Sequence, residues 1–147
     1  MQTIETARPE PHEGPIVVTE LDRRRLTGLI ALLRERDIDA SSLDELELEL
    51  DRADTVDPRD VPPDVVTMNS TVDLVDLETR ERMTLTVVFP GSANAVAGRV
   101  SVLAPVGLAL LGVRVGDPVA WRTPVRQRRA TVERISFQPE ASGMFDL

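Results

Sequence analysis

The sequence predicts an α+β fold in which a short antiparallel hairpin of two helices precedes an antiparallel sheet with one helix across it. Apolar residues recur at helical spacing in the first part, and runs rich in Val, Leu and Thr follow Pro62 and Pro63. The charge divides at the same place. Residues 1–60 hold 16 Asp and Glu against 8 Arg, whereas residues 61–147 hold 9 of each type. An acidic helical part joined to a neutral β-rich part favours a protein that docks on a partner over an enzyme with a pocket.

Three regions follow from this pattern. Residues 1–15 contain three prolines and no hydrophobic period, so we expect a disordered tail. Residues 16–57 are expected to form the short antiparallel coiled-coil hairpin. Residues 58–147 are expected to form the sheet domain, because Pro58 cannot continue a helix.

The first predicted helix begins after Thr19 and ends near Arg36. Residues 16–18 are an extended lead-in, and Thr19 with Asp22 resembles a capping box, in which the threonine oxygen accepts a hydrogen bond from a free backbone N–H group. The apolar positions recur at steps of three and four. They predict one buried stripe that consists of Leu26, Leu29, Ile30 and Leu33.

A second predicted helix follows a turn over residues 37–41, with Ser42 and Glu45 as a second capping pattern. Its apolar residues are spaced 3-4-3, which is typical of a two-helix seam; they are Leu43, Leu46, Leu50 and Ala53. The outer face is acidic and carries Asp44, Glu45, Glu47, Glu49 and Asp51. Leu48 is expected to be exposed on this hairpin, where it could contact a partner, although a single apolar residue on a surface is ordinary.

Beyond Pro63 the pattern is typical of β-strands separated by turns. The predicted strands cover residues 65–68, 71–77, 83–89, 119–122 and 131–137. A short helix is predicted over residues 102–111. Pro105 lies in its first turns, where the fixed φ of proline is tolerated, and Gly112 lies beyond its end.

Composition excludes several classes of chemistry. The chain has no cysteine, so it has no disulfide, thiolate metal site or cysteine nucleophile. Its single histidine, His12, lies in the predicted tail, where no histidine triad or phosphohistidine site can be assembled. All 17 basic residues are arginine, which excludes Schiff-base chemistry of lysine. We therefore expect no catalytic residue, no metal site and no cofactor.

Charge and hydropathy also limit the location and the partners. No apolar run approaches the roughly 20 residues that span a bilayer. The N-terminus lacks the basic start and apolar stretch of a signal peptide, so we expect a cytoplasmic protein that does not bind membranes. We also expect a monomer. A net charge of −8 and four aromatic residues disfavour direct binding of nucleic acid.

Charged side chains gather at two predicted turns. Asp37 and Asp39 occupy the turn of the helical hairpin, from which carboxylates could reach a metal ion in another protein's active site. Aspartate is also a favoured turn residue, which is the simpler explanation. Arg126, Arg128 and Arg129 fall in a predicted turn between the last two strands. They could contact an acidic partner or nucleic acid, but a basic loop tip is most often only solvated.

Three stretches of the sequence resemble one known family. They are DVVTMNS at residues 64–70, LAPVGLALLG at 103–112 with VGD at 115–117, and QPEA at 138–141. In this order, and over about residues 16–147, they resemble the Rnk family. That family is named as regulator of nucleoside diphosphate kinase and is related to the bacterial Gre transcript-cleavage factors.

The resemblance implies a fold and a mode of action. Gre-type factors have an N-terminal antiparallel coiled coil and a C-terminal FKBP-like domain. The C-terminal domain docks at the rim of the RNA polymerase secondary channel, and the coiled coil enters the channel. Acidic residues at its tip hold a catalytic magnesium ion and water for the cleavage of backtracked RNA.

The docking surface of the family corresponds to five positions of this chain, which are Asn94, Ser101, Ala104, Pro105 and Val106. Pro105 matches the family motif. Ala104 lacks the serine hydroxyl of that motif and Asn94 lacks the charge of its aspartate, whereas Ser101 offers a hydroxyl nearby. The resemblance therefore implies a retained docking surface with different polar contacts.

The length of the hairpin limits which roles of Gre residues the resemblance implies for this chain. A first helix of about 17 residues is only about 25 Å long, and the Gre coiled coil is far longer. Asp37 and Asp39 are therefore not expected to be catalytic. We expect a non-enzymatic transcription regulator that binds polymerase, competes with Gre-type factors without cleaving RNA, and touches DNA or RNA only through the polymerase.

Other functions stay open at this point. The chain could be a true cleavage factor that acts through Asp37 and Asp39, or an adaptor that controls nucleoside diphosphate kinase by protein contact. An FKBP-like fold also raises prolyl isomerase activity. Isomerase pockets are lined by aromatic rings, which are few in this domain, and a fold alone does not grant a function.

Overall fold

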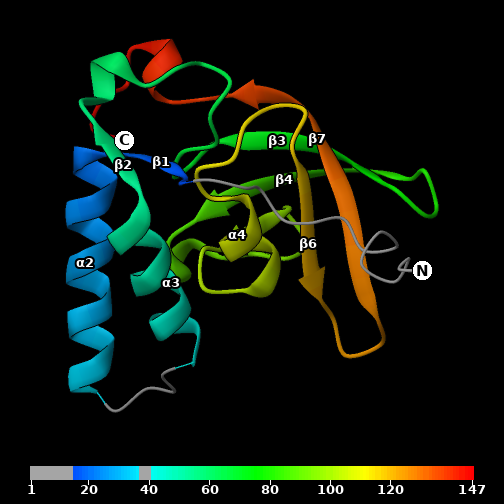
Figure 1. The fold of residues 1–147 in the computed structure, drawn as a ribbon, viewed down its shortest axis with the longest axis horizontal. Coiled ribbons are helices and arrows are strands. Elements are labelled where there is room, and N and C mark those ends of the chain that lie inside the picture. The colour runs from blue at the N-terminus through cyan, green and yellow to red at the C-terminus, as the bar shows by residue number, and fades with distance from the viewer. Residues whose placement is uncertain (1–14, 37–40) are drawn as a thin grey trace, which may run out of the picture.

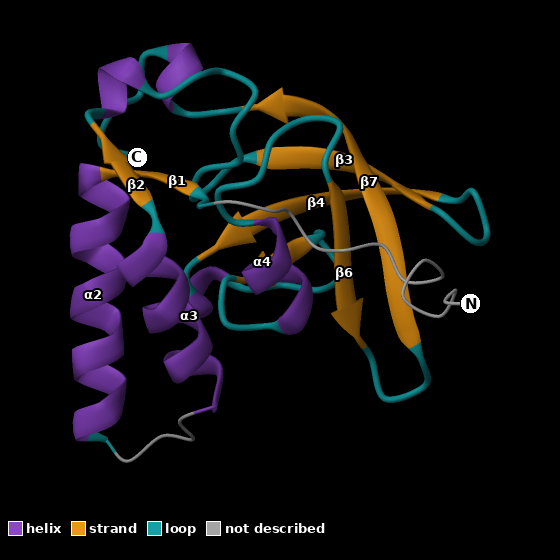
Figure 2. Ribbon diagram, in the orientation of Figure 1, coloured by secondary structure: helices purple, strands orange, loops and turns teal. Residues whose placement is uncertain are grey.

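The protein is described by a computed structural model over residues 15–36 and 41–147. Residues 1–14 of the predicted tail and residues 37–40 of the predicted turn lie outside the described residues. Ser41, which was predicted to belong to the turn, is instead the first residue of a helix. The described part is mixed α+β, with two helices beside a curled sheet (Figure 1 and Figure 2).

Three helices and seven strands make up the described fold. The helices are α2 (Glu20–Glu35), α3 (Ser41–Arg52) and α4 (Pro105–Leu110). The strands are β1 (Val17–Thr19), β2 (Asp54–Val56), β3 (Thr71–Asp76), β4 (Arg82–Val88), β5 (Arg99–Ser101), β6 (Pro118–Arg122) and β7 (Gln127–Phe137). All three predicted helices are therefore confirmed, with changes at their ends.

Local sequence signals explain α2 and α3. The side chain of Thr19 accepts a hydrogen bond from the backbone nitrogen of Asp22 at 3.0 Å, as the capping pattern predicts. Ser42, in contrast, lies inside α3, which begins one residue earlier. The predicted apolar stripes are buried or half-buried, and the fully buried members are Leu26, Ile30, Leu43, Leu46 and Leu50.

The helices share one core with the sheet. The buried stripes of α2 and α3 belong to the same cluster of side chains as residues of the sheet and of α4, among them Met68, Val72, Leu110 and Val132. In Figure 1 the two helices lie side by side along one flank of the sheet. The acidic part of the chain is therefore packed against the neutral part.

A pair of short parallel strands joins the two ends of the helical part. β1 pairs with β2, with Val17 opposite Asp54 and Thr19 opposite Val56. The lead-in before α2 was expected to be extended, but β2 has no signal of its own, since it is three residues long and mostly polar. The pairing arises because the helices bring the two segments together.

The main sheet corrects the predicted topology. Its strand order is β5-β4-β3-β7-β6, and β5 pairs with β4 in parallel, with Thr86 opposite Arg99. The sheet is therefore mixed and not antiparallel, because the chain runs back over residues 89–98 before β5 begins beside β4. Register shifts between β3 and β7 add twist, which accounts for the curl of the sheet.

The segment Val65–Met68 was predicted to be a strand, and it is not one. It forms only an isolated bridge between Val65 and Arg114, although all four residues are buried.

The side chain of Gln138, near the C-terminus, forms hydrogen bonds with this segment. Its amide nitrogen donates to the carbonyl oxygens of Pro62 and Val65, both at 2.8 Å, and its amide oxygen accepts from the backbone nitrogen of Ala141 at 3.1 Å. The QPEA motif thus has a structural role, because it satisfies buried backbone groups.

Candidate functional site

The five predicted docking residues lie in one continuous segment. Asn94 is exposed in the loop before β5, Ser101 ends β5, and Ala104 precedes α4. Pro105 is the exposed first residue of α4. Val106 is half-buried and packs against the core. The structure thus places the last four of these residues at the junction of β5 and α4, whereas Asn94 lies beside Arg99 at the start of β5. α4 is shorter than predicted because Pro105 starts it.

Backbone contacts fix the turn between β5 and α4. The hydroxyl of Ser101 accepts a hydrogen bond from the backbone nitrogen of Leu103 at 3.0 Å, and its carbonyl accepts one from Ala104 at 2.9 Å. α4 then packs so close to β5 that a Cβ atom on Gly107 would lie 2.0 Å from the carbonyl oxygen of Ser101. The Ser101 hydroxyl is used in the turn, and Gly107 sets the position of α4.

Asn94 has a role that its sequence position did not indicate. Its side-chain oxygen accepts a hydrogen bond from the backbone nitrogen of Ala97 at 3.2 Å. Its backbone nitrogen and oxygen also pair with Arg99, both at 2.9 Å. The side-chain oxygen of Asn94 therefore closes the loop that follows it, as asparagine commonly does in turns.

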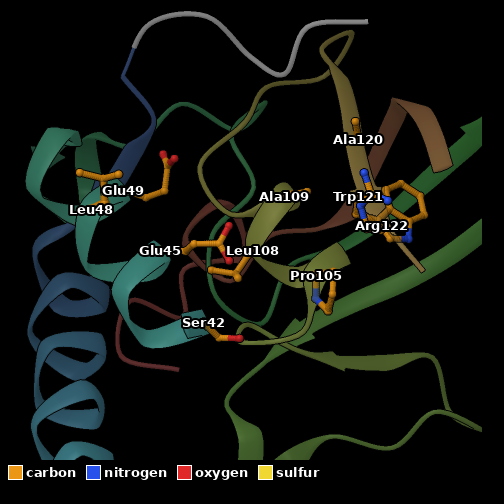
Figure 3. A pocket seen from close by; sticks show the side chains of 10 residues that line it. All are labelled: Ser42, Glu45, Leu48, Glu49, Pro105, Leu108, Ala109, Ala120, Trp121 and Arg122. Carbon is orange, nitrogen blue, oxygen red and sulfur yellow. The ribbon is translucent and has the colours of Figure 1, made fainter. Parts of the chain in front are cut away.

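A groove of about 420 Å³ lies between α3, α4 and β6 (Figure 3). α3 contributes Glu45, Leu48 and Glu49, and β6 contributes Trp121. Pro105, one of the predicted docking residues, is part of its α4 wall. The sequence signal for this groove was the exposed Leu48, whereas nothing in the sequence placed α3 opposite β6.

The acidic face of α3 has two parts. Arg34 of α2 contacts Asp44 at 2.7 Å and Glu47 at 3.0 Å. Hydrogen bonds to Glu47 and Asp44 raise the pKa of Arg34 above its ordinary value. Glu45 and Glu49 line the groove instead, and neither makes an ion pair with another described residue. Arg122 of β6 lines the same groove, so its lining carries two carboxylates and one guanidinium.

The three arginines predicted in a basic turn are ion-paired instead. Arg126 and Arg129 both contact Glu78, the latter at 3.6 Å. Arg128 lies within β7 and pairs with the buried Asp76 at 2.8 Å. Its guanidinium also lies over the ring of Trp121, 5.5 Å from the centroid. The expectation of a merely solvated loop tip is wrong, because the turn begins earlier in the chain.

A buried polar cluster ties α2 to the segment that precedes β3. The carboxylate of Asp22, which is 1% exposed, accepts hydrogen bonds from the backbone nitrogen of Met68 at 3.1 Å and from Arg25 at 2.8 Å. Burial raises the pKa of Asp22, and the contact with Arg25 opposes this. Burial likewise raises the pKa of Glu140, whose carboxylate accepts from the Thr67 hydroxyl at 2.7 Å. All partners belong to the fold itself, so the cluster is structural.

The acidic pair Asp37 and Asp39 lies outside the described residues, as does His12. Across the rest of the chain, residues 15–36 and 41–147, no three His, Cys, Asp or Glu side chains are grouped so that they could hold a metal ion. Over the same residues no helix is long and apolar enough to cross a membrane.

Comparisons with known proteins identify the family. A model described as Rnk N-terminus matches residues 15–56, and one described as Transcription elongation factor, GreA/GreB, C-term matches residues 61–137. The chain is 39% identical over 130 residues to the Regulator of nucleoside diphosphate kinase of Escherichia coli (strain K12), an alignment that covers 87% of this chain and 93% of that protein. The chain belongs to the Rnk family.

Gre proteins are similar to this Rnk-family chain as well. The Transcription elongation factor GreA of Beijerinckia indica subsp. indica is 28% identical over 141 residues, which cover 91% of this chain and 90% of that protein. A solved structure of a prokaryotic transcription elongation factor GreA/GreB from Nitrosomonas europaea matches with a TM-score of 0.71 and 38% identity. It covers 83% of this chain and 99% of that chain.

Proposed function

We propose that this protein is a non-enzymatic transcription regulator that binds RNA polymerase at the rim of the secondary channel and competes there with Gre-type factors. Membership of the Rnk family and the likeness to GreA support a regulator of this kind. In this proposal residues 58–147 are an FKBP-like docking domain, and residues 16–57 are a short antiparallel hairpin at the channel mouth. The partner is the polymerase, and the protein acts as a monomer.

One observation carries the proposed absence of cleavage. α2 has 16 residues and is therefore about 24 Å long. Its apolar stripe is packed into the core that the helices share with the sheet. A helical part that is both short and held against the body has little reach beyond it. We therefore propose that Asp37 and Asp39 stay outside the polymerase active centre and that the protein acts by occupying the channel mouth.

A competition assay tests this function. Purified protein added to backtracked elongation complexes is expected to leave the RNA length unchanged and to inhibit the cleavage that a Gre factor stimulates, because both proteins would occupy one site. The readout is the length of the labelled RNA. Shortening of the RNA that is lost in Asp37→Ala would instead identify a cleavage factor.

The docking segment gives a second prediction. Asn94→Ala is expected to weaken polymerase binding by about fivefold, because a hydrogen bond such as the one that closes this loop contributes about 1 kcal/mol. Asn94→Asp keeps the acceptor oxygen and is expected to retain most of the affinity. Titration of fluorescent protein with core polymerase measures both. Unchanged affinity in Asn94→Ala and also in Pro105→Ala would contradict the placement of the docking surface at residues 94–106.

The name of the Escherichia coli relative favours a second candidate, which is control of nucleoside diphosphate kinase through protein contact. In that case the protein would bind the kinase and fail to bind or compete on polymerase. The same titration, repeated with purified kinase, separates the two functions.

A further inference from the structure

We propose that the face of the main sheet turned away from the core carries a nucleotide-binding site across β5, β4, β3 and β7. The phosphate groups would bind Arg99, and the base would stack on Phe137. This inference goes beyond the proposed function, because it concerns a small ligand and needs no polymerase.

One row of side chains crosses four neighbouring strands on this face. Residues of β3 alternate in burial, so Thr71 is half-buried whereas the next residue, Val72, is fully buried in the core. Thr71 lies opposite Phe137 of β7 and Thr86 of β4. Thr86 in turn lies opposite Arg99 of β5. Directly opposed residues project from the same face of a sheet, so these four side chains form one row.

A hollow of about 370 Å³ lies over this row, and all four residues of the row line it. The other residues that line it are Asn69, Val88, Ser92 and Leu147. Pockets for small molecules and cofactors commonly occupy about 300–1,000 Å³. Three strand spacings separate Arg99 from Phe137, which is about 14 Å between their backbones. The hollow therefore suits an elongated ligand whose two ends differ in chemistry.

Arg99 gives one end of the hollow a positive charge. Its guanidinium makes no ion pair with another residue that the structure describes, and none of the described residues that line the hollow is Asp or Glu. Asp73, two residues along β3 on the same face, is held by Arg134 at 3.1 Å and by the hydroxyl of Thr84 at 2.7 Å. The local charge therefore favours an anion, and the planar fork of arginine matches the geometry of phosphate.

The middle of the hollow offers hydroxyl groups. The Oγ1 atoms of Thr71 and Thr86 lie 2.8 Å apart. Only one of the two hydroxyl hydrogens is used between them, so the pair keeps a donor for a phosphate or ribose oxygen. The main-chain oxygen of Leu147, which also lines the hollow, accepts hydrogen bonds from Arg25 at 2.8 Å and Asn69 at 3.2 Å. That acceptor is therefore already paired within the protein.

Phe137 distinguishes a nucleotide from inorganic phosphate. Its half-buried side chain lines the end of the hollow opposite to Arg99. Every base has a π-face, and stacking on an aromatic ring stabilises it. A guanidinium, a pair of hydroxyls and a ring thus follow one another in the order of the phosphate, ribose and base of a nucleotide.

Equilibrium dialysis of the purified chain against labelled ADP tests the site. The wild type is expected to bind ADP, and Arg99→Gln is expected to weaken this binding by about tenfold, because a charge-assisted contact with phosphate is lost. Arg82→Gln is the matched control. Arg82 projects from the same face of β4 as Thr86, but it is paired with Glu133 at 3.1 Å and does not line the hollow. This variant is expected to bind ADP as the wild type does.

Two further variants test the other parts of the ligand. Thr86→Val keeps the shape of the side chain and is expected to weaken ADP binding by about fivefold, because one hydroxyl is lost. Phe137→Leu is expected to weaken ADP binding by about tenfold through the loss of stacking. Binding of labelled inorganic phosphate is expected to stay unchanged in Phe137→Leu. Circular dichroism establishes that each variant is folded.

The outcomes separate the site from its ligand and from the proposed function. Wild-type protein that does not bind ADP at millimolar concentration would overturn the site, and so would equal losses in Arg99→Gln and Arg82→Gln. ADP that binds no more tightly than inorganic phosphate would overturn the assignment of a nucleotide. No polymerase is present in these measurements, so their failure would leave the proposed function standing, and failure to bind polymerase would leave the nucleotide site standing.

Discussion

Replacing Gly107 by alanine is expected to lower the free energy of unfolding by about 3 kcal/mol. The added Cβ atom would lie 2.0 Å from the carbonyl oxygen of Ser101 and 2.8 Å from its carbonyl carbon. Both are backbone atoms, so no side-chain rotation relieves the clash. α4 must move away from β5, which loosens the core around the buried Leu110. Chemical denaturation monitored by circular dichroism measures the change.

Gly28 provides the matched control. A Cβ atom at this position of α2 would have no neighbour within 4 Å. Alanine is a better helix former than glycine by about 1 kcal/mol, so Gly28→Ala is expected to stabilise the protein by up to this amount. The same chemical change should therefore have opposite signs at the two sites. Equal stability of the wild type and Gly107→Ala would show that α4 does not need its close contact with β5.

Asp76→Asn is expected to destabilise the protein by about 3 kcal/mol. Asp76 is fully buried at the end of β3. Its carboxylate accepts hydrogen bonds from the backbone nitrogens of Glu78 and Thr79, at 2.8 and 3.0 Å, and from Arg128 at 2.8 Å. The side-chain amide of asparagine carries no charge. Its NH2 group would also point at one of these N–H groups, which are themselves donors and cannot accept a hydrogen bond. The guanidinium of Arg128 would then lack its ion-pair partner.

The same residue predicts how stability depends on pH. Hydrogen bonds from Thr79 and Arg128 hold the pKa of Asp76 well below its ordinary value of 3.8. A carboxyl group whose pKa is lower in the folded state stabilises the fold above its unfolded pKa, and this contribution is lost as the pH falls below it. The difference in unfolding free energy between the wild type and Asp76→Asn should therefore be largest near neutral pH and should shrink below about pH 4.

Asp73→Asn, on the same strand, is the control for both effects. Asp73 also faces an arginine, Arg134, at 3.1 Å, but that guanidinium is largely exposed. Exposed pairs contribute about 1 kcal/mol or less, so this variant should cost less than Asp76→Asn. If the two variants lose equal stability, the burial of Asp76 is not what makes its ion pair important.

The elements that local sequence determines were largely predictable. The stripe of α2 and its Thr19 cap depend on residues within a few positions of each other, which periodicity and capping rules describe. The short helix α4 was predicted as well, although it begins at Pro105 and not at residue 102. Family membership, read from the motifs at residues 64–70 and 103–112, is also confirmed. The acidity of the first part of the chain was visible from composition alone.

Only the tertiary structure decided which of these features are paired, buried or exposed. β5 is parallel to β4 because of the path of the chain between them, and Arg34 neutralises Asp44 and Glu47 because α2 lies beside α3. The loop of Asn94 and the groove between α3 and β6 likewise depend on where separate elements meet. The physical reason is the separation along the sequence between the residues that interact. Helix periodicity and caps are settled by neighbours in sequence, whereas ion pairs, parallel pairings and grooves join residues whose proximity is created only when the core closes.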